Sequence, residues 1–335
     1  MRYYNIWITD IKAPVMNFTS YDFARGKTTA GALNVEFDIP IATADVPLGN
    51  AHIRIWGVGL DIINNASQLT NFNITIAAGF QRGLPLANAQ VFANPIRNGV
   101  ILSGTILQSF GNWQGTEQSL DLIISPQLYP SQAATVPDTP FMFQCLPGAP
   151  LSPSIMASLV NLGIPDPVVN VGQMVAPTGD PIQFWGSNIT DFAQQIKRVS
   201  KSINKLPSYI GALCVKTESG YMVTDNTTPT PPKIIDFTDM IGQPTWLDTQ
   251  VNGLEIQIKT MMRSDISVGD TVSLDIKNIP ILSSQQRQNQ FLKNNVAFTG
   301  TGFVSFVRHI GNMRQQDANA WVTIINVIPN QVLNG

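Results

Sequence analysis

The fold is decided by Leu254-Glu255-Ile256-Gln257-Ile258-Lys259-Thr260-Met261, a stretch in which apolar and polar side chains alternate strictly. Successive side chains of a β-strand point to opposite faces of a sheet, so this period of two predicts a strand with one buried face. Related patterns recur in the first and last thirds of the chain. We therefore predict strands over 33–39, 51–58, 72–76, 99–107, 119–124, 254–261, 268–274, 302–309 and 320–328.

Two connections in the first third also have a clear pattern. Residues 60–69 are typical of a short helix or loop, and Gly111-Asn112-Trp113-Gln114-Gly115 is rich in turn formers and is predicted to join two strands. Short strands joined by Gly/Asn turns, with no long helix between them, indicate a small antiparallel barrel or sandwich.

The middle of the chain differs. Residues 126–181 are rich in Pro and Gly and predict irregular structure with one helix around 152–162. Residues 187–204 predict an amphipathic helix, which Asn188 or Thr190 can cap. Its apolar stripe is Ile189, Phe192, Ala193, Ile196, Val199 and Ile203, and its C-terminal end carries Lys197, Arg198, Lys201 and Lys205. We interpret these cations as a solvated face that compensates the helix dipole rather than as a DNA contact. A hairpin over 211–223 and a Thr/Pro linker over 226–232 follow.

These patterns predict a mainly β fold with minor α content. We expect a first β domain over 1–128, a smaller α/β-containing middle region over 129–235 and a second β domain over 236–335. The two β domains share an order of parts, in which 53–55 aligns with 256–258, 104–106 with 302–304, and Gly111-Asn112 with Gly311-Asn312. Identity is low, so chance similarity of two β domains and duplication of one barrel both remain open.

Composition favours a subunit that is permanently assembled. Charged residues make up only 13% of the 335 residues, about half the usual fraction. Neutral Asn, Gln, Ser and Thr are buried in an interface at a lower desolvation cost than charges are. The net charge of −2 gives no overall attraction to nucleic acid or to an anionic membrane.

The sequence also predicts where the chain folds. Cys145 and Cys214 are interpreted as two buried thiols in a reducing cytoplasm. The first ten residues contain no apolar core of a signal peptide, and the chain has no apolar run long enough for a membrane span.

A search for catalytic or metal-binding patterns finds none that satisfies its chemistry. Gly26-Lys27-Thr28 imitates the end of a phosphate-binding loop, but Tyr21 stands where that loop needs glycine, and 57–59 lacks the third glycine of a dinucleotide motif. His52 and His309 have no partner at metal-ligand spacing, and Asp265, Asp270 and Asp275 are interpreted as turn and strand-edge residues. We therefore predict no enzyme, no catalytic, cofactor-binding or metal residue, and no cofactor.

Several motifs together resemble one family. Residues 239–246, 256–266 and 268–272, the ending from His309-Ile310-Gly311-Asn312 to Trp321-Val322-Thr323, and 79–86 followed by 99–113 resemble the baseplate hub proteins of tailed bacteriophages. That resemblance implies two related tube-type barrels in each chain and a homotrimer, in which six barrels form a pseudo-sixfold ring. The ring would join a tail tube protein to a trimeric central spike protein, contact other baseplate proteins and leave a channel through which DNA passes.

The resemblance also implies a structural virion protein of the phage tail, assembled in the cytoplasm of the host bacterium without membrane insertion. Three alternatives remain. A tail tube or tail-completion protein would carry one barrel, and a hub fused to a cell-wall hydrolase would need a further catalytic domain. A carbohydrate-binding β protein of the tail would use tryptophans such as Trp113, Trp185 and Trp246, which are predicted in turn-like settings, as stacking platforms rather than as structural plugs.

Overall fold

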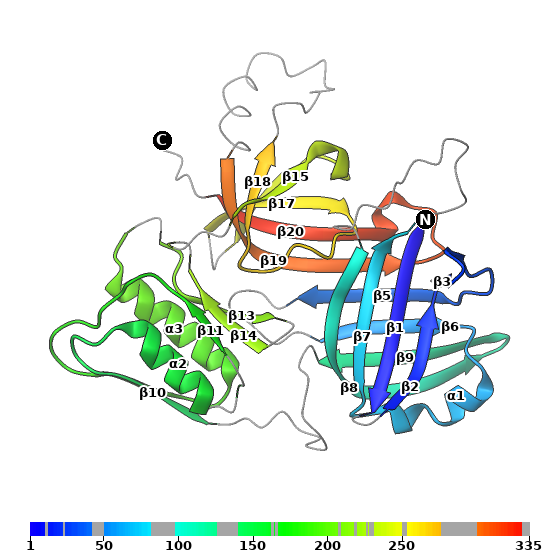
Figure 1. Ribbon diagram of the computed structural model, residues 1–335, viewed down its shortest axis with the longest axis horizontal. Coiled ribbons are helices and arrows are strands. Elements are labelled where there is room, and N and C mark those ends of the chain that lie inside the picture. Colours follow the sequence, from blue (N-terminus) through cyan, green and yellow to red (C-terminus); the bar gives the residue numbers. More distant parts are fainter. Residues whose placement is uncertain are drawn as a thin grey trace, which may run out of the picture.

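A computed structural model describes residues 1–10, 13–22, 24–41, 50–81, 98–125, 140–161, 164, 167–206, 209–217, 220–225, 227, 231–249, 253–275 and 300–329. The fold is mainly β, with antiparallel sheets and few helices, as the sequence predicts. Most of its strands belong to one large sheet, which is shown in Figure 1.

Strands β1 to β9 form the N-terminal module, and most of them make up the N-terminal part of this sheet. The strands in the large sheet are β1 (Arg2–Asp10), β2 (Ala13–Thr19), β5 (Asn34–Ile41), β6 (Ala51–Trp56), β7 (Asn73–Phe80), β8 (Asn98–Gln114) and β9 (Glu117–Ser125). The short strands β3 (Tyr21–Asp22) and β4 (Lys27–Thr28) form a separate hairpin. Helix α1 (Leu60–Asn64) and the 3-10 helix η1 (Ala66–Leu69) connect β6 to β7.

The C-terminal module contains the remaining strands of the large sheet. They are β15 (Lys233–Asp236), β16 (Thr245–Thr249), β17 (Gly253–Met261), β18 (Thr271–Asp275), β19 (Gly300–Asn312) and β20 (Trp321–Pro329). The 3-10 helices η3 (Phe237–Asp239) and η4 (Ala318–Ala320) lie before β16 and β20. Most buried apolar residues of these strands form a core distinct from that of the N-terminal module.

The middle region packs around its own aromatic core. Its elements are β10 (Phe141–Cys145), α2 (Leu151–Asn161), β11 (Val168–Asn170), β12 (Ile182–Gly186), α3 (Ile189–Ile203), β13 (Leu213–Thr217) and β14 (Gly220–Thr224). Phe141 and Phe143 of β10 pack with Phe184 of β12, and Phe192 of α3 lies edge-on to Phe141. Leu213 and Val215 of β13 join the core of the C-terminal module, so β13 anchors the middle region to that module.

The predicted helices and strands are found near their expected bounds. Helix α3 begins after Asn188, whose side chain accepts a hydrogen bond from the Asp191 amide at 2.9 Å, as the predicted cap requires. Residues 60–69 form α1 and η1, and 152–162 falls on α2. The predicted linker over 226–232 lies largely outside the described residues.

Three expectations are wrong. The predicted turn at 111–115 is mostly strand, because Asn112 and Trp113 pair with β9 and the chain reverses only after Gln114. The Pro- and Gly-rich segment also contains β10 and β11. Lys197 is buried rather than solvated, since its aliphatic stem packs against Gly211, whereas Arg198, Lys201 and Lys205 are exposed.

Trp321 of β20 packs into the core of the N-terminal module. Its ring lies edge-on to Phe37 of β5 with centroids 5.2 Å apart, and its indole N–H donates to the Gly79 carbonyl at 2.8 Å. The side chain is 1% exposed. Trp321, together with the buried Met262, therefore completes the core of the other module.

We predict that Trp321→Ala lowers the free energy of unfolding by about 3–5 kcal/mol, because it leaves a large cavity in a shared core. Trp321→Phe keeps most of the packing but leaves the Gly79 carbonyl without its donor, a loss of roughly 1–3 kcal/mol. Urea unfolding measures both. Trp185→Ala is the control, since Trp185 is 73% exposed; a Trp321→Ala effect no larger than this control would contradict the assignment.

Candidate functional site

The two modules are joined by strand pairing between β5 and β19. Six residues of each strand pair in antiparallel register, from Val307 opposite Ile41 to Asn312 opposite Glu36. Arg308 donates from Nε to Asp38 Oδ1 at 2.7 Å, and Asn312 donates to Glu36 at 3.1 Å. The Arg308–Asp38 pair is 40% and 44% exposed, so solvent screening limits its contribution to less than about 1 kcal/mol. The backbone ladder is therefore the main link of this joint.

The N-terminal strand reinforces the joint. The Arg2 guanidinium donates to the backbone carbonyls of Asn312 at 2.7 Å and Asp317 at 2.8 Å, and also to that of Gln315. These carbonyls belong to the turn that connects β19 to β20. Strand β1 thus holds the far module by one side chain.

The two modules have the same strand order. Across the sheet the N-terminal module runs β5-β6-β9-β8-β7-β1, and the C-terminal module runs β16-β17-β20-β19-β18-β15. The two series differ in the direction of the outermost strand, because β1 is antiparallel to β7 whereas β15 is parallel to β18. The other neighbours are antiparallel in both modules.

The register of the strands agrees residue by residue. One row of directly opposite residues is Asp38, His52, Ile123 and Gln108, on β5, β6, β9 and β8. The corresponding row is Thr245, Gln257, Asn326 and Phe306, on β16, β17, β20 and β19. Each row ends on the first residue after a β-bulge, which leaves out Leu107 in β8 and Ser305 in β19. A bulge at the same place in both modules is a conserved irregularity of the kind that duplication copies.

A glycine also occupies equivalent positions. Gly104 and Gly302 each lie three residues before the bulged residue, and each pairs with an apolar residue of the preceding strand, Ile74 or Val272. A Cβ on Gly104 would lie 2.1 Å from the Ser125 carbonyl oxygen, and one on Gly302 would lie 2.9 Å from that of Ile328. The close backbone approach next to the bulge therefore requires glycine in both modules.

The sequence alignment is right at Gly104 and Gly302 but two residues out elsewhere. In the structure Ile53 corresponds to Ile258 rather than to Ile256, because Ile53 pairs with Leu122 and Ile258 pairs with Ile325. Trp113 corresponds to Gly311, so the two Gly-Asn pairs are not equivalent. A shift of two keeps every side chain on its own face, and therefore the alternating pattern alone does not detect it.

The polar face of the N-terminal module is organised around Asp121, which is 1% exposed. Its carboxylate accepts hydrogen bonds from Arg54 Nε and Asn112 Nδ2, each at 2.6 Å, and from Ser119 at 3.1 Å; His52 Nε2 also lies 3.1 Å away. Burial would raise the pKa of Asp121, but the hydrogen bonds from Arg54, Asn112 and Ser119 outweigh it and lower the pKa below its usual value. The carboxylate stays ionised and ties three strands together.

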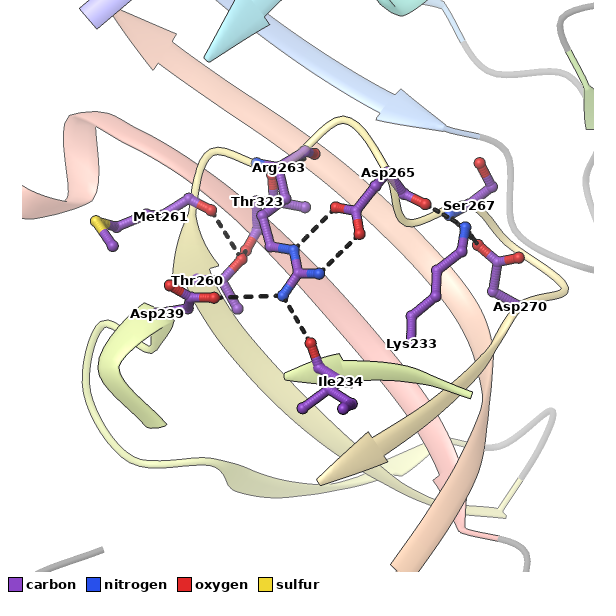
Figure 2. A network of polar contacts seen from close by, with 10 residues as sticks. All are labelled: Lys233, Ile234, Asp239, Thr260, Met261, Arg263, Asp265, Ser267, Asp270 and Thr323. Atoms are coloured by element: carbon purple, nitrogen blue, oxygen red, sulfur yellow. Dashed lines mark hydrogen bonds and ion pairs between the residues drawn. The ribbon is translucent and has the colours of Figure 1, made fainter. Parts of the chain in front are cut away.

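The C-terminal module contains a second network, centred on Arg263 and shown in Figure 2. This guanidinium, 2% exposed, donates to both oxygens of Asp265 at 2.9 and 2.7 Å, to the Ile234 carbonyl at 3.0 Å and to Asp239 at 3.4 Å. Nearby, Lys233 Nζ donates to Asp270 at 2.7 Å. The contacts fasten β15 and η3 to the turn after β17, which is a structural role.

We predict that Arg263→Ala lowers the free energy of unfolding by about 3–5 kcal/mol, because it leaves the buried Asp239 and the partly buried Asp265 without their cation. Arg308→Ala is the matched control and should lower it by less than about 1 kcal/mol, because its ion pair is exposed. Both are measured by chemical denaturation. Equal effects of the two substitutions would show that the Arg263 network is not a structural anchor.

Of the residues considered for chemistry, Asp265 and Asp270 are brought together, since Lys233 Nζ donates to the Asp265 carbonyl and to the Asp270 carboxylate. Lys27 and Thr28 form β4, with Gly26 in a turn at a φ of 63°, so the phosphate-loop imitation does not precede a helix. Asp275 ends β18, whereas Asp265 accepts hydrogen bonds from Arg263. In the described part of the chain no group of three or more His, Cys, Asp or Glu residues is placed to hold a metal ion. Of the helices in that part, none has the length and apolar character needed to cross a bilayer.

Both cysteines are buried, as predicted. Burial raises the pKa of Cys214 to about 12, so this thiol stays protonated and unreactive. Trp185 and Trp246 lie in strands β12 and β16 rather than in turns, which corrects the expectation for both. Trp113 lies near the tip of the β8–β9 hairpin and is 64% exposed.

His309 of β19 is buried, with Nδ1 2.9 Å from the Thr323 hydroxyl. Burial lowers its pKa from 6.5 to about 4. The folded state therefore holds a neutral imidazole at pH values where the unfolded state binds a proton.

We predict that His309 makes the protein less stable as the pH falls from 6.5 to about 4. The expected loss is up to roughly 1.4 kcal/mol per pH unit, because the unfolded chain takes up the proton first. His309→Gln should flatten this part of the curve of unfolding free energy against pH. The control is His52→Gln, on the surface of the other module; an unchanged slope in His309→Gln would contradict the account.

Comparison with solved structures agrees with this architecture. The tail protein from Neisseria meningitidis MC58 matches with a TM-score of 0.53 at 9% identity, over 97% of this chain and 96% of that chain. The chain has the fold of a phage-type tail protein. A second match, the 43 kDa tail protein of prophage MuSo2 from Shewanella oneidensis, gives a TM-score of 0.51 at 8% identity, over 98% of this chain and 97% of that one. No protein-family model and no curated protein matches the sequence.

Proposed function

We propose that this chain is a structural protein of a bacteriophage tail and forms the hub of the baseplate. Three copies would close into a ring of six β modules around a channel, with threefold symmetry presented to a central spike and approximate sixfold symmetry presented to the tail tube. Its function would be to bind neighbouring tail proteins through complementary surfaces, without catalysis. The protein would be assembled in the cytoplasm of a host bacterium and remain in the virion.

The observation that carries this proposal is the doubled module inside one chain. The repeated strand order and the repeated bulge give each chain two similar sheet segments, already joined edge to edge by β5 and β19. A threefold assembly of doubled units is a way to match a sixfold partner, and cyclic closure ends its growth. The fold shared with two tail proteins supports a role in a tail.

The same proposal assigns a separate role to each part of the chain. We assign the ring to residues 1–128 and 236–335, and contacts with other baseplate proteins to the middle region over 129–235, which has a core of its own. A tail tube or tail-completion protein is the alternative. It calls for one module in each chain, so the internal repeat favours the hub.

Light scattering on the purified full chain at micromolar concentration tests the proposal. We predict a particle with three times the 36.5 kDa of one chain, because an obligate ring buries interfaces well above roughly 2,000 Å². A stable monomer would overturn the hub, and a hexamer would favour a tube-type ring instead.

A further inference from the structure

The joint between β5 and β19 has a counterpart that one chain leaves incomplete. In the C-terminal module, β19 pairs with β20 on one side, and on the other it pairs first with β18 and then, from Val307 to Asn312, with β5. In the N-terminal module, β8 pairs with β9 and, only as far as Thr105, with β7. Beyond Thr105 no described strand pairs with β8 on the side opposite β9, although Ile106 still forms backbone hydrogen bonds with Asn71 and Phe72, and the Ser109 hydroxyl donates to the Ala66 carbonyl of η1.

The strand equivalent to β5 is also at the end of the sheet. Strand β16 pairs with β17, and in the described part of the chain no strand lies on its other side. Each chain thus contains one complete joint and the two separate halves of another. A head-to-tail ring would bring these halves together between neighbouring copies.

We infer that β16 of one copy pairs in antiparallel register with the end of β8 in the next copy. The internal joint sets the register, since Asp38 lies opposite Ile310. In the aligned modules Asp38 corresponds to Thr245. Ile310 corresponds to Asn112, because each lies five residues after its bulged residue. Thr245 therefore lies opposite Asn112 of the neighbour, Trp246 opposite Gly111, and Leu247 opposite Phe110.

The side chains of β8 support this partner. Phe110 is 43% exposed and Trp113 is 64% exposed, although both belong to a well-formed hairpin. In the inferred register Trp113 lies diagonal to the neighbour's Trp246, within reach for an aromatic contact across strands. Gly111 has no side chain where α1 packs closely on β8, since a Cβ there would lie 2.5 Å from Ile63 Cγ2.

The absence of protective charge along β8 points the same way. Edge strands that stay exposed usually carry Lys, Pro or inward-pointing charges that prevent pairing with other chains. Residues 108–114, Gln-Ser-Phe-Gly-Asn-Trp-Gln, contain neither a charge nor a proline. This strand end has the composition of an edge that is covered in the assembled state, and the occupant we assign is a second copy of this chain.

Disulfide trapping tests the inferred register. The inference itself rests on the proposed trimeric hub. Residues directly opposite each other in an antiparallel pair have Cα atoms about 4.5–5.5 Å apart, which suits a disulfide. We expect Asn112→Cys with Thr245→Cys to give, under mild oxidation, intermolecular disulfides and a ladder of covalent dimers and trimers on a non-reducing gel. The native Cys145 and Cys214 are buried and should not contribute.

The matched control is Asn112→Cys with Thr238→Cys. This variant carries the same change at Asn112. Because Thr238 is exposed but lies before β16, the variant should give no ladder. If light scattering shows a trimer while Asn112→Cys/Thr245→Cys gives no ladder, the inferred pairing is wrong and the hub proposal stands. If the unmodified chain is monomeric, both are wrong.

A second variant tests the same contact without a new bond. Trp113→Glu should weaken association of the chains at least about tenfold, because it places a charge against an aromatic contact at an interface. Its circular dichroism should stay unchanged, since the exposed indole of Trp113 donates a hydrogen bond only to the nearby Gly115 carbonyl, at 2.8 Å, among the described residues. Trp185→Glu changes an equally exposed tryptophan outside β8 and β16 and should leave association unchanged; equal effects of the two would overturn the contact.

Discussion

The backbone ladder between β5 and β19 is the constraint on which the rest of the structure depends. It joins strands that lie some 270 residues apart in the sequence, and so turns two sheet segments into one continuous sheet. Once its register is set, Trp321 reaches the core of the other module and Arg2 reaches the turn after β19. Neither contact exists within a single module.

The repeat within the chain explains why this joint fits. Both modules have the same strand order, the same bulge and a glycine three residues before it, although their sequences differ. They differ at the outer strand and in what lies beside the long strand: η1 contacts β8 through Ser109, whose hydroxyl donates to the Ala66 carbonyl at 2.6 Å, whereas β5 pairs with β19. Such asymmetry gives each chain an inner joint and two unmatched ends, which suits threefold assembly of doubled units.

Local patterns predicted much of the fold but not its connections. Strict alternation located β17, and the apolar stripe located α3. Strand β1 was missed because it is buried on both faces, with Tyr3 against Tyr21 on one side and Tyr4 in the main core on the other, so its residues do not alternate. The pairing of Asp38 with Arg308, and of Arg263 with Asp239, depends on tertiary placement, for which one sequence has no local signal. The sequence predicts turn-like settings for Trp113 and Trp246, whereas both lie in paired strands, and only the strand register shows this.

The central claim is that three doubled chains present six similar modules. Electron cryomicroscopy of the purified full chain tests it most directly, because symmetry is read from the averaged images without a known partner. The account predicts rings with six lobes in which alternate lobes differ, giving true threefold symmetry. Rings with one lobe for each chain, or isolated particles that do not close, would contradict it.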